Sequence, residues 1–275
     1  YVRFFDMKVV LWLAVFFSAF IAYIQAEKTK PAYRITSPVE YQIIQRGVGN
    51  KAWVELKVTA LLPISKSGLL EYRLDQNRSW EKPSGEWKNE KFVTRLRIPA
   101  GGWYGLEIRE AGNPDNRSQV VQFGVGEIFV VAGQSNSGNY GEIKQSTKTG
   151  MVSAFDFDNN KWQLAIDPQP GAGGRGGSIM PLLGDALSKK LNLPIGIIAY
   201  GQGGTSVREW LFQGSRFPNP PTVENKVRKI KDGEWESLGK IYPGFIERMK
   251  AFGKNGFRAV LWHQGESDAN QKDPT

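Results

Sequence analysis

The distribution of apolar residues changes near Gly126, and this change constrains the fold more than any other feature of the sequence. Before Gly126, turns that contain Gly and Pro separate segments in which apolar and polar residues alternate: 54–58, 70–74, 92–98 and 104–108. Alternation with a period of two indicates strands that bury one face. Short strands at this spacing predict a small antiparallel, immunoglobulin-like β-sandwich over residues 27–124.

After Gly126 the pattern changes to buried strands that alternate with helices. Apolar runs at 128–132 and 195–199 are typical of strands buried on both faces, and a third strand is predicted at 257–262. Apolar residues recur at helical spacing between them, over 182–191 and about 241–252. Strands alternating with helices predict an α/β fold with a parallel sheet and right-handed crossovers. The predicted boundary therefore falls at about residue 124, and the second domain covers residues 125–275.

The first 26 residues have the pattern of a signal peptide. Arg3 and Lys8 precede an apolar run over 9–24, and a cleavage site is plausible after Ala26. The alternative is an uncleaved membrane anchor, although a spanning helix needs about 20 apolar residues and this run is shorter. We expect a secreted or periplasmic product without stable membrane association after cleavage.

Composition excludes several classes of chemistry. The chain has no Cys and one His, His263, which excludes disulfides, thiolate catalysis and a multi-His metal centre within this chain. No metal or organic cofactor is expected. The net charge is +9, but the Lys and Arg residues are scattered, so we expect a solvated basic surface and no nucleic-acid partner. The Gly-rich segment 171–177 lacks the Gly-Lys-Ser/Thr ending of a nucleotide site. We therefore expect a flexible surface loop that covers the ligand site.

Each of the three predicted α/β strands is followed by a small, polar loop that contains glycine. These loops are Gly-Gln-Ser-Asn-Ser-Gly at 133–138, Gly-Gln-Gly-Gly-Thr-Ser at 201–206 and His-Gln-Gly-Glu-Ser-Asp at 263–268. The carboxyl ends of parallel strands lie on one edge of the sheet, where ligands bind. Taken alone, a Gly-x-Ser is usually a turn and His263 could be a core histidine. Three such loops on one edge predict a convergent site.

The residue types in these loops suit acyl transfer. Ser135 offers a hydroxyl that faces the predicted cleft, together with its own backbone N–H group. Gly204 lets a substrate oxygen approach its N–H closely, and Gln264 offers a neutral side-chain donor. Such donors form an oxyanion hole, which stabilises the negative oxygen that develops in acyl transfer.

The stretches VVAGQSNSG, GQGGTSVREW and WHQGESDA resemble the signature segments of the sialate O-acetylesterase and carbohydrate esterase family six group, within the SGNH hydrolases. The resemblance implies a flavodoxin-like, three-layer α/β/α domain preceded by a sandwich domain. It makes Ser135 the nucleophile and assigns the oxyanion hole to the Ser135 N–H, the Gly204 N–H and the Gln264 side chain. It gives supporting roles to the neighbouring motif residues Gln134, Asn136, Gly203, Thr205, His263 and Glu266, and Glu266 would orient its loop through hydrogen bonds.

One departure from the family concerns the base that a serine hydroxyl needs. The family supplies it from an Asp-x-x-His segment near the C-terminus, whereas this sequence stops at Thr275 without one. We expect that the chain is C-terminally truncated, that the His and Asp lie downstream, and that the fragment alone is inactive. The alternative is that His263 is the base, helped by Glu266 or Asp268.

The resemblance therefore predicts a serine esterase that removes O-acetyl groups from carbohydrates through an acyl-serine intermediate, as a sialate O-acetylesterase or acetylxylan esterase does. Its partner would be an acetylated carbohydrate. The alternatives are a non-catalytic glycan-binding protein with Trp-rich surfaces, a pseudoenzyme, and an SGNH lipase or thioesterase. The sugar and the oligomeric state are left open.

Overall fold

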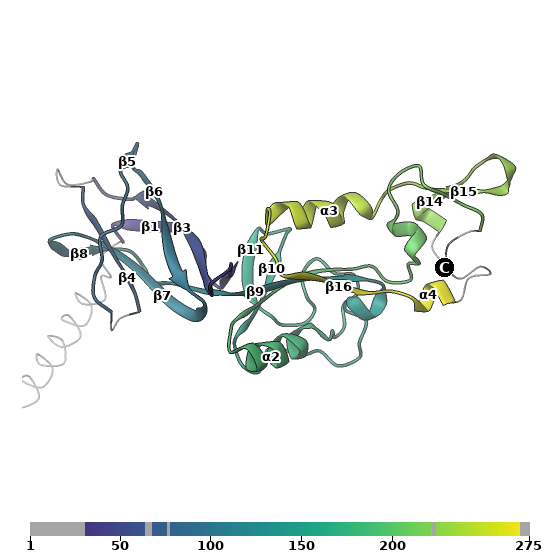
Figure 1. The fold of residues 1–275 in the computed structure, drawn as a ribbon, viewed down its shortest axis with the longest axis horizontal. Helices are drawn as coiled ribbons and strands as arrows, with labels where there is room; N and C mark the ends of the chain where they lie inside the picture. The colour runs from purple at the N-terminus through teal and green to yellow at the C-terminus, as the bar shows by residue number, and fades with distance from the viewer. Residues whose placement is uncertain (1–30, 64–67, 76–77, 220, 222–223, 270–275) are drawn as a thin grey trace, which may run out of the picture.

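The computed structural model describes residues 31–63, 68–75, 78–219, 221 and 224–269. The predicted signal peptide, residues 1–26, lies outside these ranges. The described part has a mixed α/β fold with far more strand than helix. A β-rich lobe precedes a lobe that carries the helices, and the long strand β9 (Val121–Gly133) runs through both (Figure 1). Within the described residues, no helix is long and apolar enough to span a membrane.

The first lobe consists of two packed sheets, as the alternating segments predict. One sheet is antiparallel, in the order β1 (Tyr33–Ser37), β3 (Lys51–Ala60), β6 (Lys91–Pro99) and β5 (Trp87–Lys88). The other contains β2 (Gln42–Gln45), β4 (Leu70–Leu74), β7 (Gly101–Glu110), β8 (Asn113–Arg117) and the first part of β9. Leu56 and Leu106 are fully buried in the core between the two sheets.

The prediction of a wholly antiparallel sandwich is wrong at one pair, because β2 runs parallel to β9. β2 and β3 belong to different sheets, so the short sequence between them crosses from one sheet to the other and does not close a hairpin. Its four residues carry no pattern that distinguishes a parallel from an antiparallel partner.

The second lobe is built around the rest of β9. The strand order is β11 (Lys161–Leu164), β10 (Val152–Asp156), β12 (Ile195–Gly201), β9 and β16 (Ala259–His263). All of these pairs are parallel except β10 with β11, which is antiparallel. The sheet is therefore mixed rather than purely parallel, and β10 and β11 were absent from the sequence-based prediction.

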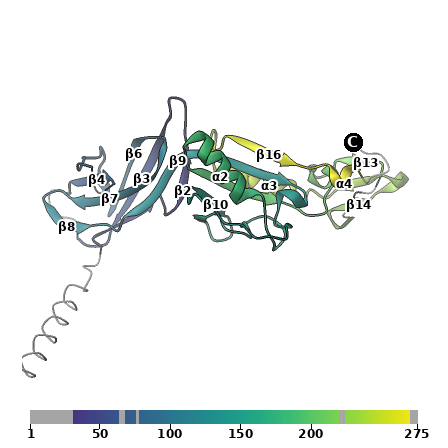
Figure 2. The same cartoon turned by 90° about the horizontal axis from the view of Figure 1, so that it is seen from below.

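The two long helices lie on opposite faces of this sheet (Figures 1 and 2). Helix α2 (Met180–Leu191) packs with Phe129 and Val131, which point to one face of β9. Helix α3 (Tyr242–Ala251) packs through Phe245 and Met249 with the other face, as its spacing predicts. Alternate residues of β9 therefore serve opposite layers, which explains its continuous apolar sequence.

Helix α2 shows why its ends fall where they do. Pro181 is tolerated in the first turn, Lys189 and Lys190 complement the helix dipole in the last turn, and Asn192 adopts the left-handed conformation that ends the helix. The buried face differs from the one that the leucine spacing suggests, because Leu182 is exposed. Gly184 instead approaches the side chain of Val152 closely.

The remaining elements form the region beyond the carboxyl ends of the strands. They are the 3-10 turns η1 (Ser135–Ser137), η2 (Val207–Trp210), η3 (Glu224–Lys226) and η4 (Lys231–Gly233), the short helix α4 (Glu266–Ala269), and a small sheet of β13 (Arg216–Phe217), β15 (Trp235–Ser237) and β14 (Val227–Lys229).

A buried carboxylate joins the two lobes. Glu127, on β9, is almost fully buried and accepts hydrogen bonds from Gln45 Nε2 at 2.6 Å, Arg46 Nε at 2.5 Å and Arg258 Nε at 2.7 Å. Gln45 belongs to β2, and Arg258 directly precedes β16. The carboxylate thus connects β9 to a segment of the first lobe and to a segment of the second.

We predict that Glu127→Gln lowers the free energy of unfolding by about 2–4 kcal/mol, because it leaves two guanidinium groups without their shared carboxylate. Urea unfolding of the purified protein measures this change. The control is Glu55→Gln, which removes the exposed pair between Glu55 and Lys57. That variant should change stability by no more than about 1 kcal/mol. Equal effects of the two substitutions would contradict the assignment.

The same carboxylate predicts acid sensitivity. Burial opposes its ionisation, but hydrogen bonds from Arg258, Gln45 and Arg46 outweigh burial and hold the pKa of Glu127 below its ordinary value of 4.5. A lowered folded-state pKa means that the stabilisation is complete above pH 4.5 and is lost as the pH falls through the folded-state pKa. The stability difference between the wild type and Glu127→Gln should therefore be constant at neutral pH and shrink below pH 4.5.

Candidate active site

The three polar loops begin at one edge of the second-lobe sheet. Strands β9, β12 and β16 end at Gly133, Gly201 and His263, and the register pairs both Gly201 and His263 with Gly133. Because all three strands are parallel, their loops leave the sheet side by side, toward α4 in Figure 1. The convergence predicted from the sequence is therefore present.

Gly133 sets the geometry of the first loop. Its φ angle is 125°, and a Cβ atom placed on it would lie 2.0 Å from the carbonyl oxygen of His263. The next residue, Gln134, donates its backbone N–H to that same oxygen at 2.9 Å, and Gln202 N donates to the Gly133 carbonyl at 2.8 Å. A side chain at position 133 would force the strands apart, so the close approach requires glycine.

Ser135 is the first residue of η1 and is partly buried. Among the residues that the structure describes, none forms a hydrogen bond with its hydroxyl. Its neighbour Ser137 differs, because that side chain is buried and donates to the Gln134 carbonyl at 2.6 Å. Of the two serines in this turn, Ser135 is therefore the one whose hydroxyl is available to a ligand.

Ser135 also lines a pocket of about 220 Å³. The opposite wall comes from the segment 141–145 and from the start of α2, and its apolar members are Ile143, Ile179 and Leu182. All three of these side chains are exposed. An apolar recess therefore lies beside the free hydroxyl.

Backbone N–H groups at this edge are open to a ligand. Over the described ranges, the N–H groups of Ser135 and Gly204 donate to no protein acceptor. Gly204 is exposed and has a φ angle of 73°, a conformation that favours glycine. Next to it, Gly203 lies under the ring of Tyr140, which a Cβ atom would approach to 2.3 Å. These glycines let the second loop present backbone donors rather than side chains.

Gln264 is held in a buried network instead of facing the cleft. Its Nε2 atom lies 3.0 Å from Gln134 Oε1, 2.7 Å from the Thr205 carbonyl and 2.7 Å from Asp268 Oδ2. Three acceptors surround a group with two hydrogens, so this orientation of the carboxamide is favoured over the flipped one. In this arrangement Gln264 connects the three loops, and its nitrogen has no spare hydrogen for a substrate.

Two further side chains complete this network. The buried Gln134 accepts the backbone N–H of Ser267 at 3.0 Å as well as the Gln264 amide. The buried Asp268 accepts Val207 N at 2.9 Å. Sequence reasoning considered Asp268 only as a helper of His263. Its position four residues after Gln264 was the signal in the sequence, because this spacing can bring two side chains together across one helical turn.

His263, Glu266 and Asn136 form a chain on the exposed side of the site. Glu266 Oε1 accepts Asn136 Nδ2 at 2.6 Å and lies 3.5 Å from His263 Nε2. The Glu266 backbone N–H, the Asn136 amide and the neighbouring His263 ring lower the pKa of the Glu266 carboxyl. Glu266 thus ties the third loop to the residue that follows Ser135.

Thr205 is fully buried and acts within the second loop. Its hydroxyl donates to the Gln202 carbonyl at 2.7 Å and accepts Trp210 Nε1 at 3.0 Å. Its hydroxyl is therefore committed to protein partners, and it fixes the loop that carries Gly204.

The Gly-rich segment 171–177 is packed against the site rather than free of it. Gly173 N donates to the Gly201 carbonyl at 2.7 Å, and Asn139 N donates to the Gly173 carbonyl at 2.8 Å. The buried Asn139 side chain bonds the backbone of Gln169 at both its amide and its carbonyl, and the buried Asp167 accepts Ser178 Oγ at 2.6 Å. The segment is therefore anchored by backbone hydrogen bonds at Gly173, and buried polar side chains bind the residues on either side of it, Gln169 and Ser178.

Comparison with known proteins extends these observations. A family model described as carbohydrate esterase, sialic acid-specific acetylesterase, matches residues 125–275. A search of curated proteins finds no match. Among solved structures, the chain is similar to a carbohydrate acetylesterase from Xanthomonas citri, with 17% identity and a TM-score of 0.43 over 87% of this chain and 53% of that one. It is also similar to a protein from Arabidopsis thaliana, with 21% identity and a TM-score of 0.35 over 52% of this chain and 58% of that one.

The chain thus spans just over half the length of each of these two structures. The family match covers more than half of the chain, from the second part of β9 through all three loops. The chain therefore belongs to the carbohydrate esterase family of sialic acid-specific acetylesterases.

Proposed function

We propose that this chain provides the nucleophile and the oxyanion-binding groups of a serine esterase that removes O-acetyl groups from carbohydrates. The observation that carries the proposal is the Ser135 hydroxyl, which has no hydrogen-bond partner among the described residues and lies on a sheet edge where, within the same residues, the Ser135 and Gly204 N–H groups are also unpaired. Membership of a carbohydrate esterase family supports the acetylated sugar as substrate. We also propose the three-layer SGNH arrangement for the second lobe, which the helices on two faces of the sheet support.

The proposed reaction proceeds in two steps. Ser135 Oγ attacks the ester carbonyl carbon, its proton passes to a base, and the sugar oxygen leaves as a hydroxyl with that proton. Water then attacks the acetyl-Ser135 ester and releases acetate, which restores the serine. In each step the carbonyl oxygen becomes negative, and the N–H groups of Ser135 and Gly204 stabilise it.

We assign Gln264 to holding the loops, since its nitrogen faces three buried acceptors. The family resemblance assigns it instead to the oxyanion hole. To serve there, its amide would have to give up the Gln134, Thr205 or Asp268 contact. The two roles predict different results on substitution, as described below.

The base has two candidate sources. The family resemblance points to a histidine of an Asp-x-x-His segment, which the sequence of 275 residues does not contain. The alternative is His263, which faces Glu266 and is half exposed. We propose that His263 orients the third loop, and that His263→Gln in the protein made from the complete reading frame lowers turnover less than Ser135→Ala does.

The apolar recess beside Ser135 favours an alternative function, that of a lipase or thioesterase. A long acyl chain would lie along Ile143, Ile179 and Leu182. Comparison of p-nitrophenyl acetate with p-nitrophenyl octanoate separates the two functions. We expect the acetate to be preferred.

We further propose that the protein is secreted or periplasmic, because residues 1–26 have the pattern of a signal peptide.

We predict that Ser135→Ala lowers kcat for an acetyl ester at least about 10³-fold, because the nucleophile is lost. The protein from the complete reading frame is assayed with p-nitrophenyl acetate, and an organophosphonate probe should label only the wild type. The matched control is Ser137→Ala in the same turn, which loses one buried hydrogen bond and about 1 kcal/mol of stability. Normal turnover by Ser135→Ala would refute the mechanism, and absence of labelling would favour a glycan-binding protein or a pseudoenzyme.

We predict that Gln264→Ala lowers both kcat and the free energy of unfolding, the latter by about 1–3 kcal/mol, because it leaves buried acceptors without a donor. Asp268→Asn should reproduce the loss of stability, since the Asp268 carboxylate shares the network. Urea unfolding and acetyl-ester kinetics give the two readouts. A fall in kcat with unchanged stability would instead identify Gln264 as an oxyanion donor.

A further inference from the structure

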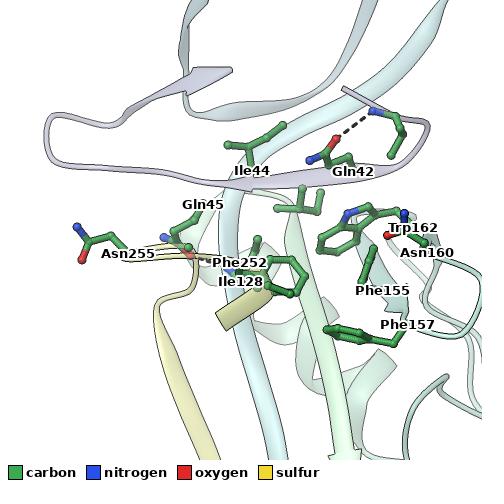
Figure 3. A pocket seen from close by; sticks show the side chains of 14 residues that line it. Gln42, Ile44, Gln45, Ile128, Phe155, Phe157, Asn160, Trp162, Phe252 and Asn255 are labelled. Atoms are coloured by element: carbon green, nitrogen blue, oxygen red, sulfur yellow. Dashed lines mark hydrogen bonds between the residues drawn. The ribbon is translucent and has the colours of Figure 1, made fainter. Parts of the chain in front are cut away.

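A second pocket, of about 480 Å³, lies away from Ser135, where the two lobes meet (Figure 3). Its lining comes from β2, from the β10–β11 hairpin and from the residues around the end of α3. Ile128 lines it at the beginning of the second-lobe part of β9, seven residues before Ser135. At ~3.3 Å per strand residue, the two sites are on the order of 20 Å apart.

One wall of this pocket is aromatic and rigid. Phe155 contacts Trp162 and Phe252 with ring centroids 5.3 Å apart in each pair, and it meets Phe157 at 4.9 Å. These mutual edge contacts fix the rings before any ligand binds, so little side-chain freedom is lost on binding. The wall offers apolar surface of the kind that packs against C–H groups.

The rest of the lining carries carboxamides. Gln42, Asn160 and Asn255 line the pocket beside the aromatic wall, and in Figure 3 Asn255 lies to the left of the rings and Asn160 to the right. In the described ranges, the Gln42 Nε2 group, both asparagine side chains and Trp162 Nε1 have no hydrogen-bond partner. Gln45 differs, because Glu127 and the Ile128 N–H occupy its amide. The unpaired groups are therefore available to a ligand.

The lining contains no charged residue, although the chain carries a net charge of +9. A phosphate or carboxylate would find no cation among the lining side chains, and a metal ion would find no anionic ligand; Arg248 does not line the pocket and is stacked on the rings of Phe157 and Tyr200. A purely apolar ligand would bury unpaired amides at a cost. A carboxamide both donates and accepts, as a hydroxyl does, so the groups match a neutral molecule that combines C–H faces with several hydroxyls.

We propose that this pocket is an accessory binding site for neutral saccharide units, separate from the Ser135 site. The aromatic wall contacts the C–H face of a sugar ring, and Gln42, Asn160 and Asn255 bind its hydroxyls. One consequence rests on the proposed esterase function. A polymer held here raises the local concentration of its ester groups near Ser135, so KM for a polymeric substrate falls.

Two variants test the site without touching the Ser135 loops. Asn160 and Asn255 have φ angles of 47° and 63°, so the double variant Asn160→Gly, Asn255→Gly removes both carboxamides and keeps the backbone permissible. Ala251 is the exposed last residue of α3 and lines the pocket, so Ala251→Trp fills it. The matched control is Asn192→Gly, at a φ of 53° outside the pocket.

Binding is measured by isothermal titration calorimetry with xylotetraose and cellotetraose as neutral probes, and N-acetylneuraminic acid and adenosine as comparisons. We expect saturable binding of at least one neutral tetrasaccharide. Each asparagine removed should weaken it about fivefold, the effect of one neutral hydrogen bond. Ala251→Trp should abolish binding, whereas Asn192→Gly should leave it unchanged. Thermal unfolding confirms that each variant is folded.

The proposal is overturned if neither tetrasaccharide binds, if adenosine or N-acetylneuraminic acid binds more tightly at these residues, or if the asparagine and tryptophan variants bind as the wild type does. Ser135→Ala should retain full saccharide binding. Ala251→Trp should retain turnover of p-nitrophenyl acetate and show a raised KM only for acetylated polysaccharide. Failure of the esterase proposal and failure of this one are therefore separable.

Discussion

The absence of a side chain at Gly133 is the constraint on which the active-site edge depends. β9 lies between β12 and β16, and its last residue pairs with the last residues of both. A Cβ atom at this position would occupy the space of the His263 carbonyl oxygen, so β16 would have to move away. The contacts of Gln134 with the third loop would then be broken, and Ser135 would lose the frame that orients it. Sheet register and site geometry are therefore consequences of the same close contact.

Much of the fold could be predicted because burial leaves a periodic pattern in the sequence. Alternation located β3, β4, β6 and β7, and apolar runs located β9, β12 and β16, since each of these strands is long enough to repeat its pattern. Strand β10 was missed because it buries the polar residues Ser153 and Asp156, which mask the pattern, and β11 was missed because its four residues are too few to show one. The parallel pairing of β2 was missed because direction depends on the path of the chain, which a four-residue segment does not encode.

Part of the candidate site could likewise be predicted from the sequence, and part of it could not. Its location followed from three polar loops after three strands, a property of the sequence read through the topology of parallel sheets. The direction of the Gln264 amide did not follow, because it depends on the Thr205 carbonyl and the Asp268 carboxylate, which come close only in the folded chain. The packing of the segment 171–177 was hidden for the same reason. Its glycines suggest freedom, whereas the Asn139 amide, more than 30 residues earlier in the chain, donates to the Ala172 carbonyl, and Asp167 accepts the N–H of Ser178 directly after the segment.

The lobes are joined by a strand rather than by a linker. β9 is hydrogen-bonded to β7 and β2 in its first part and to β12 and β16 in its second, and the Glu127 carboxylate adds bonds at the crossing point. A hinge between domains needs a segment that can change its backbone angles, and a strand paired on both edges resists this. The separation between the lobe junction and Ser135 is thus a fixed length. On the proposed functions of the two pockets, a glycan that occupies both must carry its acetyl group at a fixed distance from the sugar unit bound at the lobe junction.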